Sequence, residues 1–69
     1  MNRGLTKAIL ELLDEETDMW MKDMYPRLRR QFPELTRSQL SATLSVLERY
    51  GRVLHLCRGA WASVEYPYR

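Results

Sequence analysis

One stretch decides the fold, residues 36–61, which read TRSQLSATLSVLERYGRVLHLCRGAW. Thr36 and Gln39 are spaced as a capping box, in which each side chain satisfies a free backbone N–H at the start of a helix. Apolar residues then recur on one face of that helix; they are Leu40, Leu44 and Leu47, flanked by Tyr50. Gly51 can take the left-handed conformation that ends a helix. We therefore expect a capped helix over about residues 37–50, with the leucines and Tyr50 facing the core.

A β-hairpin is expected directly after this helix. Residues 52–57 form a β-branched and aliphatic run, Arg58-Gly59 has the composition of a turn, and residues 60–64 form a second run. The sequence predicts a two-stranded hairpin over about residues 52–64. We expect Trp61 to pack between this hairpin and the preceding helix.

A first helix is expected over about residues 5–14. Its inward face consists of apolar residues at helical spacing: Leu5, Ala8, Ile9, Leu12 and Leu13. Carboxylates at the C-terminal end of a helix oppose its dipole, so we expect the acidic residues 14–18 to form a surface loop. Leu10 lies off the inward face, where an exposed leucine and a dimer contact are both reasonable interpretations.

A second helix is expected over about residues 23–32. Residues 19–21 precede it as a short extended segment, which we expect to carry Trp20 into the core. Asp23 is the expected N-cap, and this places Pro26 in the first turn, where the N–H that proline lacks would be unpaired anyway.

The composition predicts one small α+β domain over residues 1–69, because the chain is too short for two domains. With 45% hydrophobic residues the chain belongs to the globular rather than the disordered class. Cys57 is the only cysteine and His55 the only histidine, so we expect no disulfide within the chain, no zinc site and no cofactor. A core this small provides little stability, and association of two chains remains as a way to add to it. We therefore expect a homodimer.

The net charge of +2 conceals an asymmetry along the chain. Residues 1–18 carry two basic and five acidic side chains, a net −3, whereas residues 19–69 carry nine basic and four acidic side chains, a net +5. Most of the basic residues are arginines, whose forked guanidinium group suits phosphate oxygens. This pattern indicates an acidic partner.

The predicted order of elements resembles that of the winged helix-turn-helix superfamily, and residues 35–61 carry the resemblance most closely. Its most specific part is the spacing from the capped helix through Tyr50-Gly51 and Val53 to Arg58-Gly59-Ala60-Trp61. The resemblance implies three helices and a C-terminal two-stranded β-wing. It also implies a small DNA-binding regulator of transcription, of prokaryotic, phage or plasmid type. In such proteins the third helix enters the major groove of double-stranded DNA and the wing lies along the backbone.

The predicted third helix carries small side chains opposite its leucines, which would let its backbone approach the floor of a groove. This helix has few of the arginine and asparagine side chains that recognise guanine or adenine through two hydrogen bonds. We expect Arg37 to read bases, with Ser38, Ser41 and Ser45 as adaptable contacts beside Ala42. The expected phosphate contacts are six arginines of the second helix, the end of the third helix and the hairpin: Arg27, Arg29, Arg30, Arg49, Arg52 and Arg58.

Other functions are also open to this sequence. The serine-rich, arginine-poor centre of the third helix would suit a protein–protein interaction module that binds no nucleic acid. An enzyme is not expected, because the sequence has no paired catalytic carboxylates, no phosphate loop and no nucleophile–base arrangement beyond the lone His55 and Cys57. These two residues are interpreted as ordinary strand residues, and no small-molecule ligand is expected.

We expect a cytoplasmic protein, associated with the nucleoid if it binds DNA. No apolar run approaches the ~20 residues of a membrane span, and residues 1–20 lack the pattern of a signal peptide.

Overall fold

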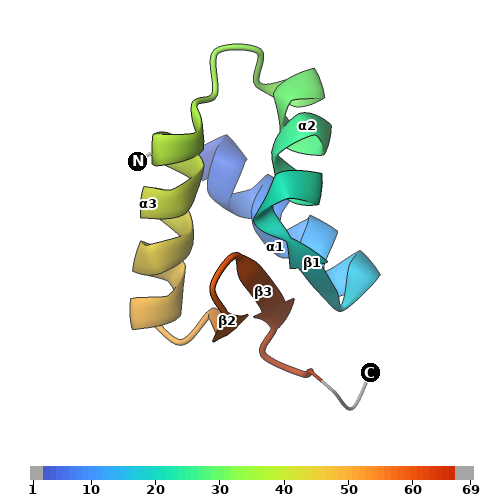
Figure 1. Cartoon of the computed structure of the whole chain (residues 1–69), viewed down its shortest axis with the longest axis vertical. Coiled ribbons are helices and arrows are strands. Elements are labelled where there is room, and N and C mark those ends of the chain that lie inside the picture. The colour runs from blue at the N-terminus through green and yellow to red at the C-terminus, as the bar shows by residue number, and fades with distance from the viewer. Residues whose placement is uncertain (1–2, 67–69) are drawn as a thin grey trace.

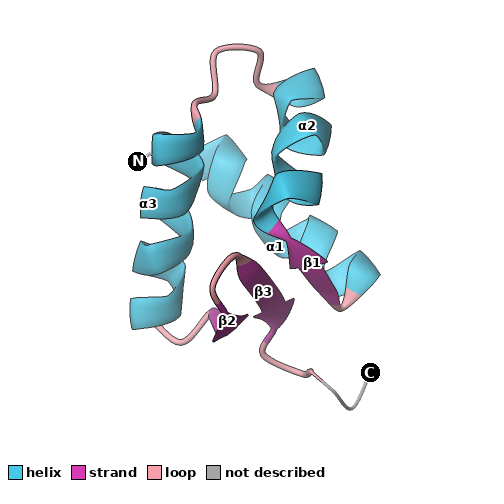
Figure 2. Ribbon diagram, viewed as in Figure 1, coloured by secondary structure: helices cyan, strands magenta, loops and turns pink. Residues whose placement is uncertain are grey.

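The computed structural model describes residues 3–66, which form three helices and a three-stranded antiparallel sheet (Figure 1, Figure 2). The chain is therefore α+β, as expected. In chain order the elements are α1 (Arg3–Glu16), β1 (Asp18–Trp20), α2 (Met21–Gln31), α3 (Arg37–Arg49), β2 (Val53–Cys57) and β3 (Ala60–Ser63).

The sheet differs from the expected two-stranded wing because a third strand joins the hairpin. β2 and β3 form the predicted antiparallel pair, and β1 pairs with the other edge of β3, giving the order β1-β3-β2. Met19 lies opposite Trp61, and Trp20 lies opposite Ala60. A three-residue strand is too short to show a period of two, so the sequence alone indicated only an extended segment here.

α3 begins and ends as its sequence predicts. The Gln39 backbone N–H donates to Thr36 Oγ1 at 3.1 Å and the Thr36 N–H donates to Gln39 Oε1 at 2.9 Å, so the capping box is complete. At the other end Gly51 has φ +72°, and its N–H donates to the Glu48 carbonyl. The Arg52 N–H donates to the Leu47 carbonyl, and these two bonds together make a Schellman motif.

α1 continues to Glu16, beyond the expected end near Asp14. Thr17 ends the helix with φ +72°, and its N–H donates to the Leu13 carbonyl at 2.8 Å. The exposed carboxylates of the last turn cost only about 0.3–1 kcal/mol each against the helix dipole, and water and salt screen them. That cost is too small to stop the helix where the sequence suggested.

α2 begins at Met21, two residues earlier than expected, and Asp23 is not its N-cap. Trp20 occupies the N-cap position without a side-chain bond, and the Met21 N–H donates to the Gly59 carbonyl at 2.7 Å. A backbone group of the hairpin turn thus satisfies the start of this helix. Pro26 consequently lies inside the helix rather than in its first turn, where it removes one backbone donor.

One hydrophobic core joins the three helices to the sheet within the described residues. Its buried members are Leu5, Ile9, Leu12 and Leu13, then Met24, Leu28 and Leu35, then Leu40, Leu44, Leu47, Val53 and Trp61. Leu10 is half-buried and packs against this cluster. No helix within residues 3–66 is long and apolar enough to cross a membrane.

Two aromatic residues lie outside the core, contrary to expectation. Trp20 is 48% exposed, because Met19 rather than Trp20 is the inward residue of β1. Tyr50 is 75% exposed, because it is the C-cap residue and has left the helical face that Leu47 still follows. Trp61, by contrast, is buried as expected.

Thr17 and Gly51 offer a matched test of backbone strain, because both have φ +72° at the end of a helix. A β-branched residue is strained there, whereas glycine is not. We expect Thr17→Gly to raise the free energy of unfolding by about 0.5–1 kcal/mol, the relieved strain exceeding the entropy that glycine adds to the unfolded chain.

The reverse substitution supplies the control. Nothing lies within 4 Å of a Cβ built on Gly51, so Gly51→Ala introduces strain without a clash. Its expected cost is about 1–2 kcal/mol. Denaturant unfolding measures both variants, and equal signs for the two would contradict this explanation.

Candidate nucleic-acid interface

The outer face of α3 is open to solvent and carries small side chains. We define this face as Ser38, Ser41, Ala42, Ser45 and Arg49, all exposed. The opposite face of the helix is buried. The one polar residue there, Thr43, donates its hydroxyl to the Gln39 carbonyl at 2.8 Å. The orientation of α3 about its axis therefore places the serines that we expected to contact DNA together on one exposed face.

Arg37 lies at the first turn of α3 and is held toward α2 by an aromatic ring. Its guanidinium carbon is 5.4 Å from the centre of the Tyr25 ring, and that of Arg29 is 5.8 Å from the same centre. The Tyr25 hydroxyl donates to the Leu35 carbonyl at 3.0 Å, which fixes the ring between α2 and α3. Arg29 also donates to the Pro33 carbonyl at 2.7 Å. Two arginines from different helices are thus held together at this junction.

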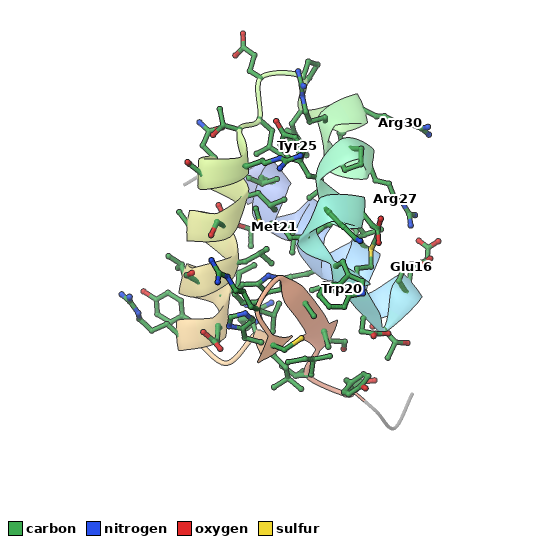
Figure 3. All side chains as sticks on the ribbon, in the orientation of Figure 1. Glu16, Trp20, Met21, Tyr25, Arg27 and Arg30 are labelled. Carbon is green, nitrogen blue, oxygen red and sulfur yellow. The ribbon has the colours of Figure 1, made fainter. Side chains whose placement is uncertain are left out.

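Sequence reasoning placed Arg29 with its neighbours on α2, but the structure separates them. Arg27 lies 3.7 Å from a Glu16 carboxylate oxygen, and in Figure 3 Arg27 and Arg30 both point away from α3. Arg29 follows Tyr25 by one helical turn and so lies on the α3 side. That spacing of four was the signal in the sequence that could have distinguished Arg29.

The hairpin turn is folded onto the start of α2. The Gly59 carbonyl accepts the Met21 N–H, and a Cβ built on Gly59 would lie 3.7 Å from the Trp20 ring. Gly59 has φ +85°, a conformation that favours glycine. Arg58, which is exposed, therefore lies in a turn that is packed against the start of α2.

His55 covers the buried Trp61 on the sheet. The two rings are stacked, with centres 4.0 Å apart and planes 7° from parallel, and they are partners across β2 and β3. His55 Nδ1 is 3.8 Å from a Glu48 carboxylate oxygen, which links β2 to the last turns of α3. Trp61 Nε1 is buried, with no hydrogen-bond partner in the part of the chain described. His55 therefore has a packing role, and Cys57 is an exposed strand residue.

The acidic residues of the N-terminal part of the chain gather away from α3. They occupy the C-terminal half of α1 and the start of β1, and all are exposed: Glu11, Asp14, Glu15, Glu16 and Asp18. In Figure 1 this end of α1 lies on the other side of the sheet from α3. The charge asymmetry of the sequence is thus also an asymmetry of the surface.

No group of three or more potential metal ligands occurs among residues 3–66. Comparison with protein-family models, curated proteins and solved structures finds no match to the chain.

Proposed function

We propose that the protein is a DNA-binding transcriptional regulator with a winged helix-turn-helix fold, in which α3 enters the major groove of double-stranded DNA. The observation that carries this proposal is the outer face of α3. Its side chains other than Arg49 are small, Arg37 and Arg49 lie near the two ends of the helix, and the acidic cluster of α1 lies elsewhere.

The dimensions and chemistry of this face suit a major groove, which is about 12 Å wide and admits one α-helix. Ser38, Ser41 and Ser45 allow close approach and can donate to or accept from several bases. Arg37 reads bases from the first turn, while Arg49 and Arg58 contact phosphates. Affinity then comes mainly from phosphate contacts, and base readout is limited.

The order of elements also supports a winged helix. β2 and β3 correspond to the wing, and β1 extends the same sheet. Because the turn at Gly59 is held by the start of α2, the wing is short, and Arg58 is its contact with the backbone. Arg27 and Arg30 lie outside the surface proposed here, because they point away from α3.

Substitution of the arginines tests duplex binding, with a preferred site first obtained by selection from random duplexes. We expect Arg37→Ala to reduce the preference for that site over a scrambled duplex by about 5-fold or more, because one good base contact contributes about 1–3 kcal/mol. Arg49→Ala and Arg58→Ala should each lower the slope of log K against log salt by about 0.9, the value for one lost phosphate contact. Fluorescence anisotropy across a salt series measures both quantities.

Arg30→Ala is the matched control, since it removes an exposed arginine from the far side of α2. Its affinity and salt slope should equal those of the unmodified protein. Unchanged duplex binding by the Arg37→Ala, Arg49→Ala double variant would overturn the proposal.

The homodimer expected from the small core has a candidate surface along β2. This strand forms one edge of the sheet, and the apolar Leu54 and Leu56 on it are 36% and 39% exposed. Edge strands carry backbone groups free to pair with another chain, and antiparallel pairing of two copies of β2 satisfies two-fold symmetry. Pairing would bury both leucines and present two copies of α3 to successive half-sites.

Introducing positive charge at the free edge of β2 tests whether this edge forms the dimer interface. The Leu54→Lys, Leu56→Lys double variant should be a folded monomer in sedimentation, because lysines on an edge strand oppose strand pairing. Val64→Lys is the control, since Val64 is 50% exposed but lies outside the strands. A dimeric double variant, or a monomeric unmodified protein at the concentrations used for DNA binding, would exclude this surface.

A protein–protein interaction module is the second candidate, and one feature favours it. An open, largely apolar groove of about 770 Å³ lies between the start of α1, the α2–α3 loop and α3, lined among others by Leu5, Phe32, Ala42 and Val46. Grooves of this kind accept apolar side chains of a partner. Failure to bind any duplex at low salt would favour this function over DNA binding.

A further inference from the structure

A line of aromatic and basic side chains crosses the molecule from the hairpin turn to the start of α3. We call this surface the aromatic–basic strip and define it as Trp20, Lys22, Tyr25, Arg29, Arg37 and Arg58. Lys22, Tyr25 and Arg29 are three and four residues apart, so they share one face of α2. Arg37 joins this face through the Tyr25 ring at 5.4 Å, and the hairpin turn joins it where Gly59 meets the Trp20 ring. Three separate parts of the chain therefore build the strip.

The cations of the strip are not neutralised by acidic side chains. Lys22, Arg29, Arg37 and Arg58 are all exposed, and within residues 3–66 none forms an ion pair with a carboxylate. Arg27, on the other side of α2, does form one, with Glu16. Unpaired cations along about 10 Å of one helix, the rise from Lys22 to Arg29, match the repeated charge of a phosphodiester chain.

The two aromatic residues have different roles in the strip. The guanidinium carbons of Arg29 and Arg37 lie 5.8 and 5.4 Å from the centre of the Tyr25 ring, so this ring positions both arginines. Trp20 is 48% exposed, and the Lys22 ammonium group lies 5.9 Å from the centre of a Trp20 ring. Lys22 has a flexible stem and can move to a phosphate when a planar group takes its place over the indole.

We propose that the aromatic–basic strip binds single-stranded DNA, with phosphates on the four cations and one base stacked on Trp20. Within a duplex the bases stack on one another and offer no free face to an indole, whereas single-strand sites combine cations with exposed aromatic rings. Asp18 lies two residues before Trp20 on the same side of β1 and is exposed, so the bound strand ends its path at Trp20. This surface shares Arg37 and Arg58 with the proposed duplex interface but does not include the serines of α3, and it extends the proposed nucleic-acid function to a second type of DNA.

The test is anisotropy of a labelled oligothymidine of about ten nucleotides, titrated with the full chain at about 50 mM salt. Trp20→Ala should weaken binding by about 5-fold or more, the loss expected for one stacked base, whereas Trp20→Phe should retain most of the affinity. Lys22→Ala should lower the salt slope by about 0.7, the value for a phosphate contact on a single strand. Quenching of tryptophan fluorescence on binding should be lost in Trp20→Ala, because the remaining Trp61 is buried.

Tyr50→Ala is the matched control, because Tyr50 is another exposed aromatic residue but lies at the far end of α3. Its affinity for oligothymidine should not change. Thermal unfolding of each variant excludes loss of the fold as the cause of weaker binding.

Binding of single-stranded DNA and binding of duplex DNA can be tested independently of each other. Weaker duplex binding by Arg49→Ala, with its lower salt slope, and intact oligothymidine binding support two surfaces. Equal affinities of the unmodified protein and Trp20→Ala for oligothymidine, or no binding of the oligonucleotide at all, would overturn this proposal and leave the duplex proposal standing.

Discussion

Burial of the leucines of α3 is the constraint on which the proposed interface depends. Leu40 and Leu44 have no exposed surface and Leu47 has 4%, and each buried leucine side chain stabilises the fold by roughly 1.5–3 kcal/mol. Any rotation of the helix that turned the serines inward would expose these side chains to water. The core therefore sets which face of α3 meets solvent. The capping box and the Schellman motif set where the helix begins and ends.

The sheet places the other elements around that helix. β1 pairs with β3, and the Gly59 carbonyl accepts the first N–H of α2, so the hairpin turn, Trp20 and the start of α2 form one unit. About one turn further along α2, the Tyr25 hydroxyl donates to the Leu35 carbonyl, and the Tyr25 ring holds Arg29 and Arg37 together. Contacts that serve folding thus also arrange the cations. The two proposed DNA surfaces share Arg37, at the corner where α2 and α3 meet, and Arg58, in the hairpin turn.

Features with a local signal could be predicted from the sequence, and features set by distant contacts could not. The ends of α3 follow from Thr36, Gln39 and Gly51, and the hairpin follows from its turn at Gly59. The exposed position of Trp20 and the early start of α2 depend on contacts with the hairpin, which comes much later in the chain. No local sequence pattern could therefore predict them. The serines of α3 could be assigned to one face from periodicity alone. The separation of Arg29 from Arg27 and Arg30 depends on the Tyr25 contacts and on the direction in which α3 approaches α2.

Amide nitrogen–proton correlation spectra recorded while duplex DNA is added test the central claim most directly, because they locate the contact surface without any substitution. The shifts are expected to concentrate on the outer face of α3, at Ser41, Ser45 and Arg49, with smaller changes at Arg58. The amides of residues 14–16, at the acidic end of α1, should not move. Shifts confined to that end of α1 or to the groove near Phe32, with none along α3, would contradict this claim.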